Sequence, residues 1–330
     1  MANDEKQVLK VAQRSERMLL SLTEQIQAQK EELHENTFYQ VYAKAALAKL
    51  PKLTRASVDY AVNEMEESGY QFDKRAAGSS TKYAMSIENI IDIYQHRGVP
   101  KYRDRHPEAY TIFVGNLKGG VSKTVSTVSL AHALRAHPHL LFEDLRILVI
   151  DLDPQSSATM FLNHERSVGI VEATAAQAML QNVSREELIK EFIVPSIIPG
   201  VDVLPASIDD AFIASRWDEL CAEHLPGQNV HAVLYENVIA KLKKDYDFIF
   251  IDSGPHLDAF LKNAIAASDL LMTPVPPAQV DFHSTLKYLT RLPELIDIIE
   301  QSGAPCRLQG NIGFMSKLSN KADHKLCHSL

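Results

Sequence analysis

The spacing of apolar positions separates an N-terminal segment from the rest of the chain. Residues 4 to about 36 contain no glycine or proline, and apolar side chains recur there every three or four residues. This spacing predicts one long helix, and a dimerisation segment at residues 1–37, because an apolar stripe of this length favours pairing with a second copy. A surface helix that lies on its own domain is the alternative. The stripe consists of Val8, Ala12, Ser15, Leu19, Leu22, Ile26, Gln29 and Leu33.

Residues 38–106 have a shorter and more interrupted pattern. "FYQVYAKAALAKL" ends at Pro51, and "LTRASVDYAVNEMEESGY" begins at the candidate N-cap Thr54 and ends at Gly69, which predicts two helices and a tight turn. "QFDKRAAGSSTKYAM" has the pattern of a hairpin with a Gly-Ser-Ser tip. "IENIIDIYQHRGV" predicts one more helix, and polar "PKYRDRHPEAY" predicts a linker. This order is typical of a winged helix-turn-helix domain.

A winged helix-turn-helix domain binds DNA with its second helix in the major groove and its hairpin on the backbone. We therefore expect Arg55, Ser57 and Asn63 to face the bases. Phosphate contacts are expected from Lys74, Arg75 and Lys82. The charge supports this, because residues 74–105 carry seven basic and three acidic side chains, whereas the net charge of -8 arises beyond residue 110. A small helical adaptor that binds protein is the alternative.

Beyond Tyr110, short apolar runs alternate with helical stretches, and several runs are continuously apolar. Such runs predict a mostly parallel, doubly wound sheet covered by helices on both faces, so we place an α/β domain at residues 107–330. Ligands bind such sheets beyond the carboxyl ends of the strands. The runs are "TIFVGN" (111–116), "RILVIDLD" (146–153), "VDVLPAS" (201–207), "FIFIDS" (248–253), "LLMTPVP" (270–276) and "LQGNIGFM" (308–315).

The first of these strands leads into "GNLKGGVSKT" (115–124), a variant of the phosphate-binding loop GxxxxGK[ST]. Backbone N–H groups and the dipole of the following helix would bind phosphate. We expect Lys123 to reach the β- and γ-phosphates and Thr124 to bind Mg²⁺. Val125 is expected to pack inward. The residues assigned to the nucleotide are Lys118, Gly119, Gly120, Val121, Ser122, Lys123, Thr124 and Val125.

Three carboxylates end two other predicted strands. Asp252 ends "FIFIDS", and Asp151 and Asp153 lie in "LVIDLDPQ". We expect Asp252 and Asp151 to join Thr124 at the metal, and Asp153 to orient the water that attacks the γ-phosphorus, since phosphoryl transfer depends on positioning and charge. For Asp153, capping of the turn through Pro154 is the alternative.

A second lysine, Lys118, stands before the Gly119-Gly120 turn, on its far side from Lys123. Both lysines cannot easily converge on one phosphate chain, so we expect Lys118 to point outward. In a face-to-face dimer it would reach the partner's nucleotide and neutralise charge on the γ-phosphate, as an arginine finger does. Lys118 and Asp153 are therefore the candidate catalytic residues, and dimerisation would depend on ATP.

Composition bears on cellular location and on possible disulfide or zinc sites. The chain has 330 residues, of which 45% are hydrophobic, and no run approaches the roughly eighteen apolar residues of a membrane span. The N-terminus "MANDEKQVLK" lacks the features of a secretory signal, so we expect a cytoplasmic protein. Three widely spaced cysteines suggest neither a disulfide framework nor a zinc site.

Together, "KGGVSKT", "VIDLDPQSSAT" and "FIFIDSGP" resemble the deviant Walker ATPases, and most closely the larger ParA plasmid-partition ATPases with an N-terminal winged helix-turn-helix. The resemblance implies a homodimeric, nucleoid-associated bacterial ATPase that hydrolyses ATP slowly with Mg²⁺ as cofactor and is stimulated by a ParB-type centromere-binding protein. It implies nonspecific DNA binding in the ATP state and, with ADP, binding to its own operator as a repressor. Lys118 corresponds to the signature lysine, Asp151 and Asp153 to the Walker A′ carboxylates, and Asp252 to the Walker B aspartate.

Two departures from the family pattern lie at Ser122 and Val125, where most relatives have glycine and threonine, and they are expected to alter loop conformation and turnover. The chain stops at "KADHKLCHSL" within an apparent helix, so we expect that a C-terminal part with basic DNA-contacting residues is missing. A nucleotide-regulated repressor with little hydrolysis is the main alternative. A division-site membrane ATPase would need an amphipathic C-terminal helix, and an electron-transfer relative of nitrogenase iron protein would need suitably placed cysteines. The sequence shows neither feature.

Overall fold

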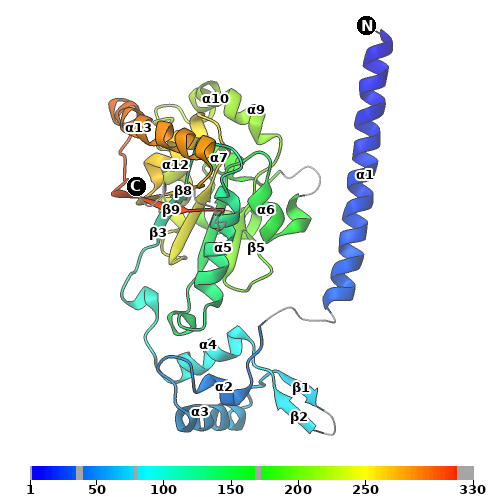
Figure 1. Cartoon of the computed structure of the whole chain (residues 1–330), viewed down its shortest axis with the longest axis vertical. Helices are drawn as coiled ribbons and strands as arrows, with labels where there is room; N and C mark the ends of the chain where they lie inside the picture. Colours follow the sequence, from blue (N-terminus) through cyan, green and yellow to red (C-terminus); the bar gives the residue numbers. More distant parts are fainter. Residues whose placement is uncertain (1, 35–39, 78–79, 168–171, 318–330) are drawn as a thin grey trace. The chain divides into compact units, whose positions relative to one another are not determined.

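The chain forms two compact units, which are described here separately (Figure 1). The computed structural model describes residues 2–34, 40–77, 80–167 and 172–317. The first unit contains the residues up to Arg97 and a short segment that begins at His164, which includes the turn η3 (His164–Ser167). The second unit contains Gly98–Asn163 and the residues from Glu172 onward. The predicted C-terminal helix in "KADHKLCHSL" lies outside the described residues.

The long N-terminal helix is confirmed as α1 (Ala2–His34). Every side chain of α1 whose placement the structure describes is exposed. The apolar ones include Leu9, Val11, Met18, Leu19, Leu20 and Leu22, each about half exposed or more. Of the predicted stripe, the described side chains Ala12, Ser15, Leu19 and Leu22 are exposed, and exposed apolar side chains along a helix favour pairing with another helix. Self-association through α1 remains a prediction.

The predicted winged helix-turn-helix pattern is present in the first unit. The helix expected before Pro51 is reduced to a single turn, and Tyr42 instead pairs with Met85 through two backbone hydrogen bonds. Thr54 caps the second helix as predicted, in a reciprocal capping box with Ser57. The tip of the hairpin lies outside the described residues. The elements are α2 (Lys44–Leu47), α3 (Arg55–Glu67), antiparallel β1 (Lys74–Ala77) and β2 (Ser80–Tyr83), and α4 (Ile87–His96).

The second unit is built on a sheet that has seven strands among the described residues, in the order β5-β6-β4-β7-β3-β8-β9. All six predicted strands are present and parallel. The sequence did not reveal β5 (Val194–Pro195), an antiparallel edge strand that is too short for a pattern. The six are β3 (Tyr110–Val114), β4 (Ile147–Asp151), β6 (Val201–Leu204), β7 (Phe248–Asp252), β8 (Leu270–Val275) and β9 (Gly310–Met315).

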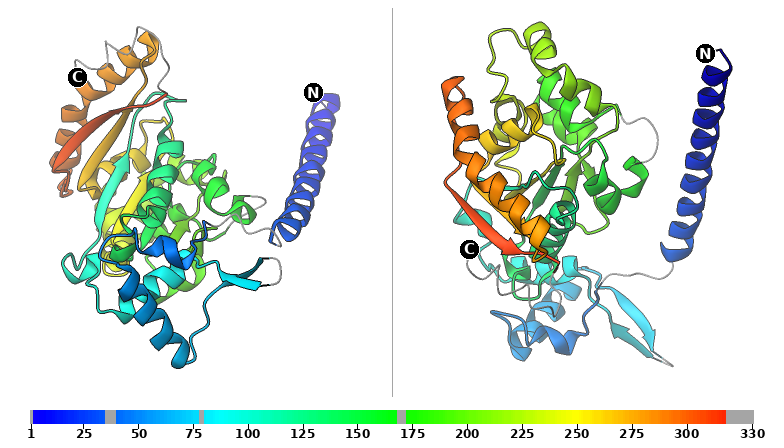
Figure 2. Two further views of the ribbon diagram at one scale, coloured as in Figure 1. Left: turned by 60° about the horizontal axis from the view of Figure 1, so that its bottom comes forward. Right: turned by 45° about the horizontal axis from the view of Figure 1, so that its top comes forward.

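Alternate residues of the central strands pack against helices on opposite faces of the sheet, which confirms the doubly wound architecture (Figure 2). Ile147 and Val149 face α5 (Lys123–Ala136) and α6 (Ser157–Leu162). Leu148 and Ile150 face the other layer. That layer includes α7 (Ala175–Gln181), α10 (Trp217–His224), α12 (Ala259–Ala267) and α13 (Gln279–Gln301).

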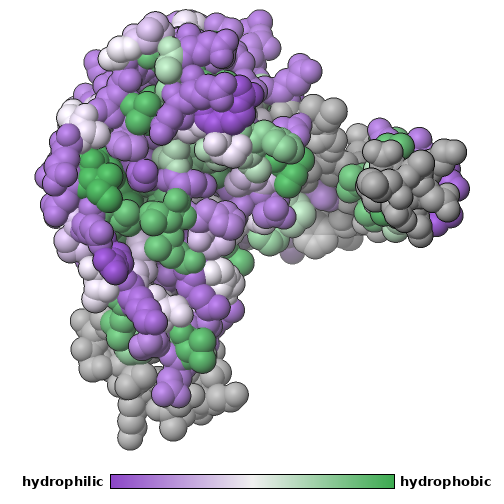
Figure 3. Space-filling view, turned by 90° about the horizontal axis from the view of Figure 1, so that it is seen from above, coloured by the Kyte–Doolittle hydropathy of each residue, from purple (hydrophilic) through white to green (hydrophobic). Residues whose placement is uncertain are grey.

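Shorter helical segments connect these elements. They are η1 (Tyr102–Asp104), η2 (Leu141–Glu143), α8 (Arg185–Glu187), η4 (Leu188–Phe192), α9 (Asp210–Ser215), η5 (Tyr235–Ile239) and α11 (Ala240–Leu242). No described helix is long and apolar enough to cross a membrane. On the face shown in Figure 3, hydrophobic side chains lie in separate patches among hydrophilic ones.

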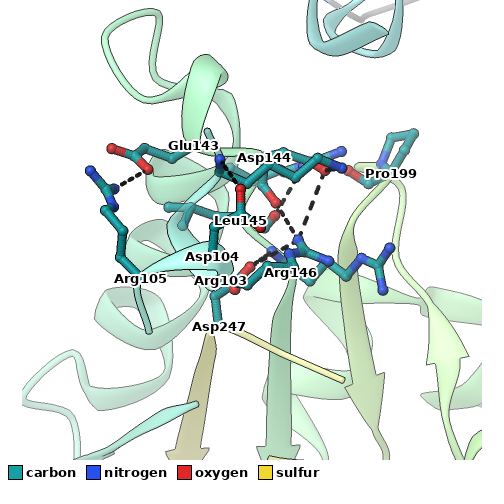
Figure 4. Close-up of polar contacts among 11 residues, drawn as sticks. Arg103, Asp104, Arg105, Glu143, Asp144, Leu145, Arg146, Pro199 and Asp247 are labelled. Carbon is teal, nitrogen blue, oxygen red and sulfur yellow. Dashed lines mark hydrogen bonds and ion pairs between the residues drawn. The ribbon is translucent and has the colours of Figure 1, made fainter. Parts of the chain in front are cut away.

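Basic side chains of the predicted linker bind acidic residues where the strands begin (Figure 4). The Arg103 guanidinium donates to Asp247 at 3.1 Å, and the Lys101 ammonium lies 2.9 Å from Asp144. Arg105 pairs with Glu143. Three of the seven basic side chains in residues 74–105 are therefore paired with acidic residues of the second unit.

Asp144 connects this linker to the end of α5. Its carboxylate also accepts a hydrogen bond from the buried guanidinium of Arg135 at 2.9 Å. Burial raises the pKa of Asp144, but the hydrogen bonds from Arg135 and Lys101 outweigh this effect and bring the pKa below its ordinary value. The ionised carboxylate is therefore preferentially stabilised in the folded state.

We predict that Asp144→Asn lowers the free energy of unfolding of the second unit by about 3 kcal/mol at pH 7, because it leaves Arg135 buried without its counter-ion. Since the folded pKa is lowered, the difference from wild type should shrink as pH falls below about 4. The single tryptophan, Trp217, is buried in this unit, so its fluorescence in denaturant reports the unfolding. Glu294→Gln, which removes an exposed ion pair, should change stability by less than about 1 kcal/mol. Equal effects of the two variants would contradict the prediction.

Candidate functional site

The loop "GNLKGGVSKT" joins the end of β3 to the first residue of α5, as predicted. Ser122, the residue before the helix, has φ 75° and ψ 29° and no side-chain capping bond. This left-handed conformation favours glycine and costs an ordinary residue about 1–2 kcal/mol. Gly120 has a similar φ of 74°. Serine at this position therefore introduces local strain at the point where the helix begins.

Lys123 lies inside this loop rather than in solvent. Its Nζ donates to the main-chain oxygen of Lys118 at 3.3 Å, and only 7% of the residue is exposed. Burial lowers the pKa of the ammonium, while the charges of Asp252 and Asp153 act in the opposite direction. The helix start and this ammonium thus present positive potential at the carboxyl end of the sheet.

Asp252 is fully buried at the end of β7, and no hydrogen bond of ordinary geometry reaches either of its carboxylate oxygens from the described residues. Burial, followed by the neighbouring charge of Asp151, raises its pKa well above the ordinary value, and the Thr124 side chain acts in the opposite direction. A buried carboxylate without a partner is costly unless a cation binds it. Asp252 and Thr124 therefore fit a hard divalent cation such as Mg²⁺.

Asp151 pairs with Asp252 across β4 and β7, but its oxygens already have partners. One accepts the backbone N–H of Asp153 at 3.0 Å, and the other accepts the backbone N–H and the hydroxyl of Thr159, both at 2.8 Å. Burial raises the pKa of Asp151 to about 7, against the effect of these hydrogen bonds. The geometry thus favours Asp252 over Asp151 as the carboxylate that binds a metal directly.

Asp153 is half-buried in the loop after β4, and its Oδ1 accepts the backbone N–H of Gln155 at 3.0 Å. Asp153 therefore caps the turn that follows it, as the alternative interpretation of the sequence predicted. A Cβ built on Gly254 would lie 3.4 Å from this oxygen, so the loop after Asp252 passes beside Asp153. The sequence-predicted carboxylates are brought together at one edge of the sheet.

One sequence prediction about the loop is wrong, and one residue has a contact that the sequence did not predict. The ammonium of Lys118 lies 3.5 Å from Asp281 at the start of α13. Val125 does not pack inward but is 54% exposed on α5. The remaining loop residues lie in one turn, with Gly119 and Gly120 exposed and Val121 buried. Asp281 carried no recognisable signal in the sequence, because it lies far from Lys118 along the chain.

The residues predicted to bind DNA have different surroundings. Arg55 and Asn63 are exposed on α3, and Arg75 and Lys82 are exposed on the hairpin. The Ser57 hydroxyl is engaged in the capping box, which leaves it poorly placed for base contacts.

Lys74, at the base of the hairpin, binds Glu66 at 2.7 Å and lies 4.8 Å from the ring centroid of Tyr83. A phosphate contact by this lysine would have to compete with Glu66.

Sequence reasoning missed Tyr60, which is 69% exposed on α3. It follows Ala56 by four residues and precedes Asn63 by three, so the three side chains share one helical face. This spacing was available in the sequence and would have identified an aromatic side chain on the surface of the second helix.

Comparison with known proteins gives matches over both units. Residues 15–106 match the family model "ParA helix turn helix domain", and residues 109–303 match the model "AAA domain". "Plasmid partition protein A" of Escherichia coli is 78% identical over 99% of this chain and 82% of its own length. Protein SopA of Escherichia coli strain K12 is 29% identical over 66% of this chain and 53% of its own length.

Solved structures show the same similarity. A structure described as "Partition Protein" superimposes with a TM-score of 0.86 at 55% identity, covering all of this chain and 88% of that one. Cobyrinic acid a,c-diamide synthase from Mycobacterium smegmatis, solved with an ATP analogue and magnesium, matches 67% of this chain and 79% of its own, with a TM-score of 0.54 at 22% identity. The latter match concerns the fold alone.

We predict that Ser122→Gly raises the free energy of unfolding of the second unit by about 1 kcal/mol, because glycine adopts a positive φ without steric strain. Ser122→Ala retains the strain and should remain within about 0.5 kcal/mol of wild type. Trp217 fluorescence in a denaturant titration measures both. A Ser122→Gly variant no more stable than Ser122→Ala would show that the left-handed conformation carries no strain.

Proposed function

This chain belongs to the ParA family of plasmid partition proteins, and we propose that it hydrolyses ATP with Mg²⁺ as a homodimer to segregate DNA. The observation that carries the proposal is Asp252, a fully buried carboxylate that accepts no hydrogen bond of ordinary geometry from the described residues. Lys123, Thr124 and the start of α5 lie at the same edge of the sheet. A nucleotide triphosphate with its cation would satisfy the carboxylate, the ammonium and the free backbone N–H groups together.

In the proposed reaction, N–H groups of the loop and Lys123 bind the phosphates. Bound Mg²⁺, held by Thr124 and Asp252, would supply charge stabilisation. Asp153 orients a water for attack on the γ-phosphorus, and the bond to the β-γ bridging oxygen breaks to release ADP and phosphate. Lys118 of the partner stabilises charge on the γ-phosphate, which makes dimerisation depend on ATP and release depend on hydrolysis.

The helix-turn-helix unit supports a role in DNA binding. We propose nonspecific DNA binding in the ATP state, operator binding as an autorepressor in the ADP state, and stimulation of weak turnover by a ParB-type centromere-binding protein. The protein would then act on the bacterial nucleoid. The exposed Arg55, Tyr60 and Asn63 of α3 are the proposed base-contacting residues, and Arg75 and Lys82 the phosphate-contacting ones.

We predict that Lys123→Gln reduces ATP and ADP affinity more than about tenfold, because the variant loses a buried charge that contacts the phosphates. Lys118→Ala should retain ADP affinity and lose ATP turnover, because its target is the partner's γ-phosphate. Equilibrium nucleotide titration and phosphate release measure the two effects. Unchanged affinity in Lys123→Gln would contradict the phosphate-binding assignment, and equal loss of binding in both variants would place Lys118 in its own subunit's site.

We predict that the nucleotide selects the type of DNA bound. Binding of random duplex and of the promoter fragment upstream of the protein's own gene should be measured with ADP and with a nonhydrolysable ATP analogue over a range of salt concentrations. Random duplex should bind better with the analogue, with a steep salt dependence, and the promoter fragment better with ADP. The alternative, a repressor that uses nucleotide structurally, predicts operator binding but no phosphate release with or without DNA.

A further inference from the structure

The proposed function leaves unexplained why Lys118 contacts its own subunit. Its ammonium lies 3.5 Å from Oδ1 of Asp281, which occupies the first turn of α13. The Lys118 side chain is 37% exposed and that of Asp281 is 25% exposed. The pair is therefore accessible to solvent, and a more strongly charged competitor can displace it.

The backbone beside Lys118 is attached to the same part of α13. Asn116 is fully buried, and its Oδ1 accepts the backbone N–H of Lys118 at 3.0 Å. Its Nδ2 donates to the Thr285 hydroxyl at 2.9 Å and to the Pro274 carbonyl at 3.0 Å. The Thr285 hydroxyl in turn donates to the main-chain oxygen of Asp281 at 2.9 Å. The backbone N–H and the side chain of Lys118 are thus both connected to the first turns of α13.

We propose that Asp281 is a positioning residue that retains Lys118 in its own subunit until the γ-phosphate of the partner's nucleotide displaces it. This inference rests on the proposed role of Lys118 across the dimer. A triphosphate bound to the partner offers several anionic oxygens, whereas Asp281 offers one partly buried carboxylate. ADP lacks the γ-phosphate and leaves Lys118 with Asp281. Asp281 therefore contributes to the discrimination between ATP and ADP in pairing of the two ATPase faces.

The alternative is that Asp281 only stabilises the start of α13, where an acidic residue interacts favourably with the helix dipole. Such a role changes stability but leaves the ammonium of Lys118 unaffected. Chemical reactivity of that amine therefore separates the two roles. Asp281→Glu keeps the charge at the helix start and the ion-pair partner. Asp297→Asn, at an exposed position farther along α13, removes the same charge away from the loop.

Acylation of Lys118 by an amine-reactive ester, followed by mass spectrometry of the full-length protein with ADP, tests the retention directly. We expect Asp281→Asn to accelerate acylation about two- to fivefold, the range of one exposed ion pair. Asp281→Glu and Asp297→Asn should match wild type. An unchanged acylation rate in Asp281→Asn would overturn the proposal, whether or not the protein hydrolyses ATP.

Phosphate release as a function of ATP concentration tests the competition. Asp281→Asn should lower the ATP concentration at half-maximal turnover about two- to fivefold without lowering the maximal rate. A loss of maximal rate with intact ADP affinity would overturn the proposal, because Asp281 would then hold Lys118 in its active position. If Lys118→Ala keeps full turnover, the role of Lys118 across the dimer fails, while the acylation result still decides whether Asp281 retains the lysine.

Discussion

Two buried carboxylates side by side, Asp151 and Asp252, impose the main constraint on the second unit. Their strands are neighbours in the sheet, and both residues are fully buried where those strands end. Burial raises the pKa of each, and the neighbouring charge of Asp151 raises that of Asp252 further. The two carboxylates differ in the hydrogen bonds that they receive. Asp151 receives three hydrogen bonds, whereas Asp252 has none of ordinary geometry within the described chain and is left for a cation.

The opposite end of β7 shows how the same fold treats a structural acid. Asp247 precedes the strand, is 1% exposed, and accepts hydrogen bonds from the Arg103 guanidinium and from the backbone N–H of Arg146. Burial raises its pKa, and these partners offset part of the effect. Satisfied acids at the beginning of the strands fix the linker to this unit (Figure 4), and the unsatisfied acid at the other edge marks the site.

The loop between β3 and α5 combines strain with internal contacts. Ser122 adopts a left-handed conformation, Lys123 donates to the loop's own backbone, and Lys118 contacts Asp281. Each of these three features is a weak interaction or a strained geometry that a bound phosphate chain can exchange for stronger contacts. Under the proposed function, such a loop would respond to the γ-phosphate, as ATP-dependent pairing of two subunits requires.

The sequence by itself determined the elements and their chemistry. Continuous apolar runs identified six parallel strands, the absence of glycine and proline identified α1, and a glycine-bearing loop with Lys123 and Thr124 before a helix predicted the phosphate site, because these signals are local along the chain. Tertiary structure alone decided the ion-pair partner of Lys118 and the side-chain hydrogen-bond partners of Asn116. Burial, ion pairing and hydrogen bonding depend on residues distant in sequence, such as Asp281 and Lys118, which only the packing of α13 against the loop brings together.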